Sequence, residues 1–444
     1  MMAEPSARGE KQSSAGAGKG LAPGDGLALL RTAGQLFVEH WPALAVIAGA
    51  GVAAHWYLAD LAVRLGRLGA VPGMLGLSLV PFSSLLAVVG MLLVLRRREQ
   101  SRHVVADLVA AVGSVLIPFL VVYQSTGAMD DDLRNHAYSG VADDLGREQV
   151  AGTIDTTLRI PAATSLTVLA IVAVAILMRA VGGRLVRTDR LWSHREDPRR
   201  NALQVLVGYC ELVWIVLGAY VITYALTNVQ TWWDSRAVAH WLQGWWSTLE
   251  ITLPTLGAVG RWLLGAAETL AWGASTALVV PIAWLAIGVI VYGIQATDVI
   301  DDTDLARAGN SVRFLARINQ RFGDSLVTRA WHSIAEPDSR FGALLGGTAM
   351  ILRVGWSPVL LFCLAYVAVN QTPYLVWGVV RAIAGQLSNL GWIALYDPIE
   401  VVAEILGLMG SAVLLAAATD DLLHRFGAPR ALRLPGHVPT GNLK

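Results

Sequence analysis

The strongest constraint on the fold of this chain is a series of about eight apolar runs, each close to 20 residues long. A helix of about 20 apolar residues crosses the hydrocarbon core of a bilayer. Only 15% of the 444 residues are charged, compared with about 25% in soluble proteins. The runs cover residues 42–63, 71–95, 104–123, 160–181, 202–226, 272–293, 343–369 and 399–418. The sequence therefore predicts an all-α integral membrane protein with about eight transmembrane helices.

Arginine-rich connections set the predicted orientation in the membrane. They lie between the second and third runs, the fourth and fifth, and the sixth and seventh. Because cytoplasmic loops carry the excess of Lys and Arg, both termini are expected in the cytoplasm of a multi-pass protein of the plasma (inner) membrane. The acidic segment 124–159 then forms an outer loop. Arg64 and Arg67 are the exceptions, since they fall on the outer side.

Two segments of the second half, residues 182–298 and 323–420, share a series of anchors in the same order, which indicates a tandem duplication. The clearest anchor is Arg-x-x-x-Gly-x-x-x-x-Leu-x-Trp, beginning at Arg261 and again at Arg381. Both copies begin on the same side. The last four transmembrane helices are therefore expected to form two parallel hairpin repeats, each with an extracytoplasmic amphipathic helix.

The remaining chain divides around these repeats. A surface helix is expected over residues 27–38, ending before Pro42. The cytoplasmic helix 304–335 has an apolar stripe flanked by arginines, which packs on lipid or on the bundle, or docks a protein partner. The expected parts outside the repeats are a disordered cytoplasmic N-terminus (1–25), a four-span module (26–181), a connecting helix (299–322) and a cytoplasmic tail (421–444).

The two copies differ at one intramembrane position. Glu211 and Arg353 each precede a tryptophan by three residues, and the copies place them at the same depth. Charges inside a membrane need partners. We therefore predict a Glu211–Arg353 ion pair across the repeat interface, where it either locks the two repeats together or serves the movement of an ion.

Glu404 is a second carboxylate expected near the outer end of a transmembrane helix. Arg261 and Arg381 of the outer helices are candidates to reach it, and together they could line an outer vestibule for an anionic group. Packing alone also explains the repeated element, since Gly265 and Gly385 would let backbones approach closely.

Further polar residues near the outer side are interpreted as interfacial. His55 with Asp60 is one such pair, and a proton relay is the less favoured reading. Asp130–Asp132 with His136 lack the glycine and glutamate of an EF-hand loop, so a mobile acidic loop is expected there. Cys210 and Cys363 each lie within an apolar run, as expected of buried thiols.

The one enzyme-like string is acidic and lies on the cytoplasmic side. Carboxylates beside a membrane can hold Mg²⁺ against a diphosphate, but a solvated acidic turn is favoured here. The carboxylates are Asp298, Asp301, Asp302 and Asp304. The sequence implies no cofactor and no nucleic-acid partner, because it has no phosphate-binding motif and a net charge of only +1.

Three classes of function follow. The leading one is a transport or cell-envelope export component without its own ATPase, because duplicated hairpins with paired intramembrane charges suit a path at a repeat interface. The second is a non-catalytic membrane scaffold or accessory subunit. The third is a lipid-head-group enzyme that uses the acidic string. A polar cavity that contains Glu211, Arg353 or Glu404 would favour transport, and a solid interface without a cavity would favour the scaffold.

Overall fold

The computed structural model describes about two thirds of the chain. The described residues are 23–96, 104–147, 165–187, 198–252, 275–292 and 356–425, with Trp262, Gly265, Ala266, Thr269, Gly273 and Leu432. All regular structure within them is helical, apart from one isolated β-bridge between Arg96 and Leu432.

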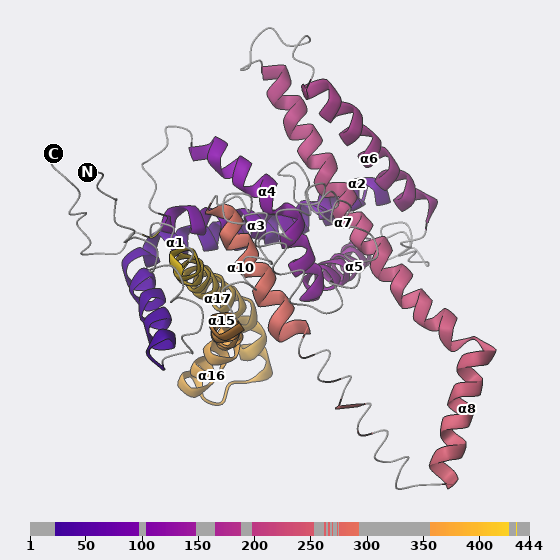
Figure 1. Ribbon diagram of the computed structural model, residues 1–444. Helices are drawn as coiled ribbons and strands as arrows, with labels where there is room; N and C mark the ends of the chain where they lie inside the picture. Colours follow the sequence, from indigo (N-terminus) through magenta and orange to yellow (C-terminus); the bar gives the residue numbers. More distant parts are fainter. Residues whose placement is uncertain are drawn as a thin grey trace, which may run out of the picture.

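The helices run in chain order through a central body and an extended arm (Figure 1). They are α1 (Pro23–Gly66), α2 (Ala70–Leu77), α3 (Val80–Leu95), α4 (Val104–Ser125), α5 (Ala128–Arg147), α6 (Leu166–Arg187), α7 (Pro198–Asp234), α8 (Ala237–Thr252), the π-helical turn η3 (Ser275–Val279), α10 (Val280–Val291), α15 (Trp356–Val369), α16 (Thr372–Ala384) and α17 (Asn389–Arg425).

Six helical stretches of the described residues are long and apolar enough to cross a membrane. They are Ala28–Gly66, Ala70–Leu95, Leu166–Val186, Val205–Ile222, Pro358–Ala384 and Asn389–Arg425. Two further predicted spans correspond to α4 and to η3 with α10, which do not belong to these six. The membrane character of the chain is therefore supported, whereas the count of eight spans is not confirmed.

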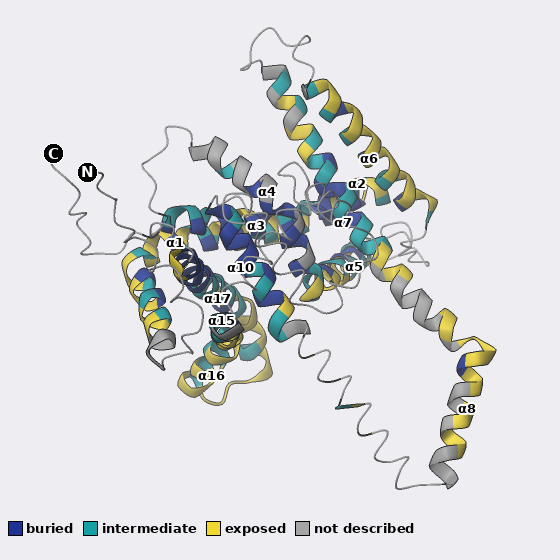
Figure 2. Cartoon of the chain, viewed as in Figure 1, coloured by how far each residue is buried: buried dark blue, intermediate teal, exposed yellow. Residues whose placement is uncertain are grey.

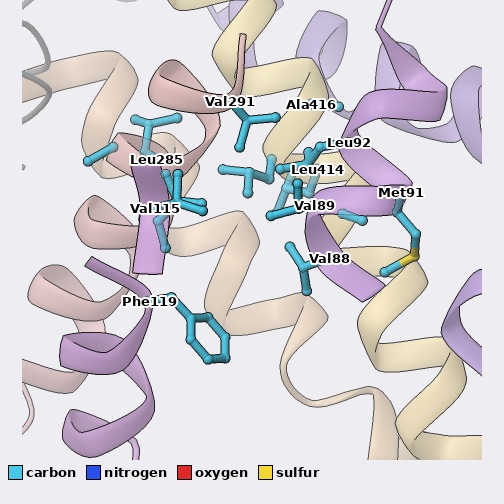
Figure 3. Packing of buried hydrophobic residues seen from close by; sticks show 14 of the residues in the cluster. Val88, Val89, Met91, Leu92, Val115, Phe119, Leu285, Val291, Leu414 and Ala416 are labelled. Carbon is cyan, nitrogen blue, oxygen red and sulfur yellow. The ribbon is translucent and has the colours of Figure 1, made fainter. Parts of the chain in front are cut away.

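The central body is built around α1, α3, α4, α10 and α17. Helix α1 packs against α2, α3 and α17, while α10 packs against α4 and α17. Figure 3 shows the apolar side chains that meet there, with Val88 and Leu92 of α3 facing Leu285 of α10 and Leu414 of α17. Gly51 of α1 permits close contact with α3, because a Cβ at this position would overlap the Cβ of Ala87.

Helix α1 corrects one prediction. The surface helix expected over 27–38 does not end at Pro42 but continues into the first span as one helix of 44 residues. At about 1.5 Å per residue it is roughly 66 Å long, about twice the hydrocarbon thickness of a bilayer. A proline inside a helix removes one backbone hydrogen bond. Here the fully buried Leu36 and Leu44 hold the helix in place on both sides of it.

Helices α6, α7 and α8 form the arm, in which α6 packs mainly against α7. Figure 2 shows that much of the described surface of α6 and α8 is exposed. On α6 most of the exposed side chains are apolar, for example Leu166, Ile176 and Leu177. On α8 they include Trp241 and Trp245. Such surfaces suit the hydrocarbon and the headgroup boundary of a bilayer, respectively.

The described helices do not confirm the pair of hairpin repeats. In the second segment α15 and α16 both pack on α17, whereas in the first α7 packs mainly on α6 and α10 on α4. The close backbone approach predicted for Gly385 was wrong, because a Cβ there would meet no described heavy atom within 4 Å. Most neighbours of Gly265 along the chain lie outside the described residues, so its predicted role stays a prediction. Gly385 instead ends α16 with a φ of 65°, a conformation that favours glycine.

Candidate functional site: a polar cluster beside a cavity

Polar side chains from several helices meet at the end of α1 that carries His55. The imidazole Nε2 of His55 lies 3.3 Å from Oδ1 of Asp132 on α5. Tyr123 of α4 donates its O–H to the other carboxylate oxygen of Asp132, at 2.5 Å. The side chains of His55 and Asp132 are only 20% and 10% exposed. Both oxygens of this sequestered carboxylate therefore have a partner.

Two more residues complete this group. The Oγ of Ser84 on α3 lies 3.5 Å from Nδ1 of His55, so both ring nitrogens have polar neighbours. Glu404 of α17 is half-buried, interacts electrostatically with His55 and Asp132, and accepts a hydrogen bond from the side chain of Trp56. We call His55, Ser84, Tyr123, Asp132 and Glu404 the His55 cluster.

The cluster overturns the expectation of a mobile acidic loop at Asp130–Asp132, because residues 128–147 form helix α5. The helix follows a turn at Gly127, whose φ of 81° favours glycine. It packs against α1 and α4, which brings Asp132 to His55. The predicted pairing of His55 with Asp60 is also wrong, since Asp60 is exposed and lies 2.7 Å from Arg64.

Helix α5 also explains how Arg67, an exception to the orientation rule, is accommodated on the predicted outer side. Arg67 Nη2 and Nε donate to the two carboxylate oxygens of Asp143, at 2.7 and 3.0 Å. These hydrogen bonds raise the pKa of the guanidinium. The two arginines that are exceptions to the orientation rule, Arg64 and Arg67, are therefore both neutralised by nearby carboxylates.

A cavity of about 220 Å³ begins beside Glu404 and lies among α3, α10, α15, α16 and α17. Its walls are mostly apolar, with Glu404, Asn370 and Ser411 as polar contributions. Trp284 and Tyr366 also line it, and their side chains are hydrogen-bonded to each other. Along α17 the lining extends from Glu404 to Leu415, about 16 Å of helix axis at 1.5 Å per residue.

Glu211 of α7 lies beside a cation of the neighbouring helix. Its Oε2 is 4.0 Å from Nε of Arg179 on α6, and the Arg179 guanidinium lies 5.8 Å from the ring centre of Trp214. Arg353, the predicted partner, lies outside the described residues. The structure thus places Glu211 at the α6–α7 contact, and the pairing with Arg353 stays a prediction.

Arg381, the other predicted site residue of the outer side that the structure describes, does not join the His55 cluster. Arg381 lines a separate open groove of about 590 Å³ with Trp377, Trp392, Ile393, Tyr396 and Asp397. Arg261 and the acidic string Asp298, Asp301, Asp302 and Asp304 lie outside the described residues. Within the described ranges, no three His, Cys, Asp or Glu side chains are arranged to hold a metal ion.

The sequence reasoning therefore identified Glu404 and His55 but missed their neighbours. The contact between Tyr123 and Asp132 could have been expected from the sequence, because the two residues are only nine positions apart and a glycine turn lies between them. Nothing in the sequence linked either of them to His55 or to Glu404. Comparison of the chain with protein-family models, curated proteins and solved structures gave no match.

Proposed function

We propose that this chain is a transport or cell-envelope export component in which the cavity beside Glu404 forms part of the path. The single observation that carries the proposal is a half-buried carboxylate that lines a cavity inside a bundle of apolar helices. Ionisable residues inside a membrane bundle are costly, and they mark ion and substrate pathways. A purely structural bundle would gain stability from filling this space, because cavities lose packing contacts.

The dimensions of the cavity fit a partial path. Its lining follows α17 for about 16 Å, roughly half of the hydrocarbon core of about 30 Å. Beyond Leu415, α17 is buried continuously from Ala412 to Asp420, so the path is closed at that end. Alternating access requires a resting state that is closed on one side, and the buried end of α17 would provide that closure.

The orientation of the chain in the membrane is part of the same proposal. By the positive-inside rule, the His55 cluster and the Glu404 end of the cavity lie on the outer side of the plasma membrane, with both termini in the cytoplasm. In this orientation the acidic helix α5 covers the cluster from outside, and Asp143 of α5 pairs with Arg67. The two parallel repeats and eight spans remain part of the proposal, with α4 and α10 as the additional spans.

Accessibility of Ser411 to thiol reagents tests the path without a known substrate. Ser411 lines the cavity and would carry the only thiol in a Cys210→Ser/Cys363→Ser/Ser411→Cys protein. We expect a membrane-impermeant maleimide to label this thiol from the outer side in intact cells and from the inner side in inverted vesicles. Both reactions should occur if the cavity opens alternately to the two sides.

A matched control places the single thiol at Ala416→Cys. Ala416 belongs to the same helix but is fully buried in the core, so it should resist labelling from both sides. Labelling of Ser411→Cys from at most one side would reject a transport path and favour the scaffold. Equal labelling of both thiols would show that the bundle is loosely packed, which also contradicts the proposal.

A further inference from the structure

We infer that Glu404 is a proton-binding group of the cavity and that the proton is the coupling ion of transport. This inference rests on the proposed transport function. It starts from the juxtaposition of a cavity-lining carboxylate with a histidine that is already fixed by a second carboxylate.

The partners of the two carboxylates differ. Asp132 accepts from Tyr123 at 2.5 Å and lies 3.3 Å from His55, so both of its oxygens are engaged on the protein side. Glu404 has the Trp56 side chain as donor, and it lines the cavity. Of the two carboxylates, Glu404 is therefore the one that a proton can reach and leave.

The charge balance of the cluster favours binding of one proton. When it is protonated, His55 supplies one positive charge against the two negative charges of Asp132 and Glu404. A net negative charge inside a bilayer is costly, and a proton on Glu404 removes it. The titratable groups that face Glu404 from neighbouring helices are His55, Tyr123, Asp132 and Tyr366, together with Glu400 on its own helix.

The described ligand set argues against a metal ion as the occupant. Divalent cations of the calcium and magnesium type take six or more oxygen ligands. The described residues bring no third His, Cys, Asp or Glu side chain into ligating position with His55 and Asp132. Proton binding needs a single carboxylate oxygen and leaves the other contacts of the cluster intact.

The step itself is a simple acid–base exchange. A hydronium ion from the outer solution transfers its proton to a carboxylate oxygen of Glu404, which forms the O–H bond and leaves one water molecule. The same O–H bond breaks when the cavity opens to the other side, and the proton passes to water there. When protonated, His55 offsets one of the two carboxylate charges between these events.

Infrared difference spectroscopy of the full chain in liposomes tests this inference directly. The spectra are recorded across about pH 5 to 8, the range in which a histidine-linked site titrates. We expect a protonated-carboxyl band that grows as the pH falls in the wild-type protein. The band should be absent in Glu404→Gln and retained in Glu400→Gln, whose carboxyl group lies one helical turn away and bonds to Tyr396.

Labelling with ¹³C-glutamate gives a second readout that needs no variant. The carboxyl band of the wild-type protein should shift to lower frequency if it belongs to a glutamate. A band that does not shift, or that survives in Glu404→Gln, would overturn the inference. Displacement of the band by Na⁺ at constant pH would assign the site to sodium and would also overturn it.

The two proposals can fail separately. If Ser411→Cys is labelled from both sides but no glutamate band titrates, the path exists and the proton is not its coupling ion. If the band titrates but Ser411→Cys is labelled from one side only, Glu404 binds a proton without being part of a transport path, and the inference about coupling fails.

Discussion

The imidazole of His55 and the carboxylate of Asp132 lie 3.3 Å apart, and both side chains are largely shielded from water. They come from α1 and α5, so their contact joins the long first helix to the acidic helix that packs across its end. Since Tyr123 of α4 donates to the same carboxylate, one acidic side chain links three helices. The cluster therefore stabilises the packing of these helices in addition to being a candidate site.

The His55–Asp132 contact should be measurable as a coupling free energy. We expect His55→Ala and Asp132→Ala each to lower the thermal stability of the purified protein. The double variant should lose less than the sum of the single losses, with a coupling of about 0.5–3 kcal/mol. A thermal unfolding series of the four proteins in one detergent checks this, and strictly additive losses would contradict the pairing.

Replacement of Tyr123 by Phe removes one hydrogen bond to the Asp132 carboxylate and leaves the ring in place. Because a buried carboxylate oxygen then lacks a donor, we expect a loss of about 1–3 kcal/mol in the free energy of unfolding. Tyr138→Phe on α5 is the matched control, since Tyr138 is 68% exposed, and its effect should stay within about 0.5 kcal/mol. Equal effects of both variants would refute the role of the Tyr123 hydroxyl.

Much of the fold could be predicted from the apolar runs, because a run of about 20 residues in a bilayer leaves the backbone little choice except a helix. The boundaries were harder to predict. Pro42 is a reasonable helix end when only neighbouring residues are considered. The helix continues because Leu36 and Leu44 are buried against the central body, and a single sequence does not reveal that packing.

The candidate site was predicted in part for a related reason. Glu404 and His55 stand out as ionisable residues in apolar runs. Asp132 is one of three consecutive aspartates, and three adjacent carboxylates indicate a solvated segment. Only the packing of α5 on α1 and α4 brings Asp132, and not its neighbours, to His55. Its exposed neighbour Asp131 pairs with Arg134 at 3.3 Å instead. Such a choice between adjacent residues depends on tertiary contacts.

The crossing of α10 and α17 depends on a glycine. A Cβ at Gly288 would overlap the Oγ1 of Thr419 and approach the Cγ of Leu415 to 3.3 Å. We expect Gly288→Ala to destabilise the protein by about 1–3 kcal/mol, the usual effect of overpacking a core. Thermal unfolding checks this against Gly378→Ala on α16, where a Cβ meets no atom of the described residues within 4 Å.

A second substitution should reverse the effect of Gly288→Ala. The Thr419 Oγ1 is buried and has no hydrogen-bond partner among the residues that the structure describes, so Thr419→Ala removes the overlapping atom at little cost. The double variant Gly288→Ala/Thr419→Ala should recover most of the lost stability. If the double variant is no more stable than Gly288→Ala, the glycine is not required for the close contact between α10 and α17.

The contact between Arg179 and Glu211 leads to a prediction that decides whether Arg179 or Arg353 is the main partner of the Glu211 carboxylate. Removal of one member of a buried ion pair leaves an uncompensated charge in the membrane, whereas removal of both does not. If Arg179 is the main partner, Arg179→Leu should lower the folded yield, and the added change Glu211→Leu should largely restore it. The folded yield is measured as the monodisperse fraction in detergent-based size-exclusion chromatography.

The same measurement on Arg353→Leu decides between the two cations. We expect Glu211→Leu to rescue Arg179→Leu better than it rescues Arg353→Leu, because the Arg179 guanidinium lies 4.0 Å from the Glu211 carboxylate. Stronger rescue of Arg353→Leu would instead establish the ion pair across the two repeats and would weaken the assignment of Glu211 to the α6–α7 contact. Arg184→Leu, an exposed position of α6, controls for the loss of a positive charge on that helix.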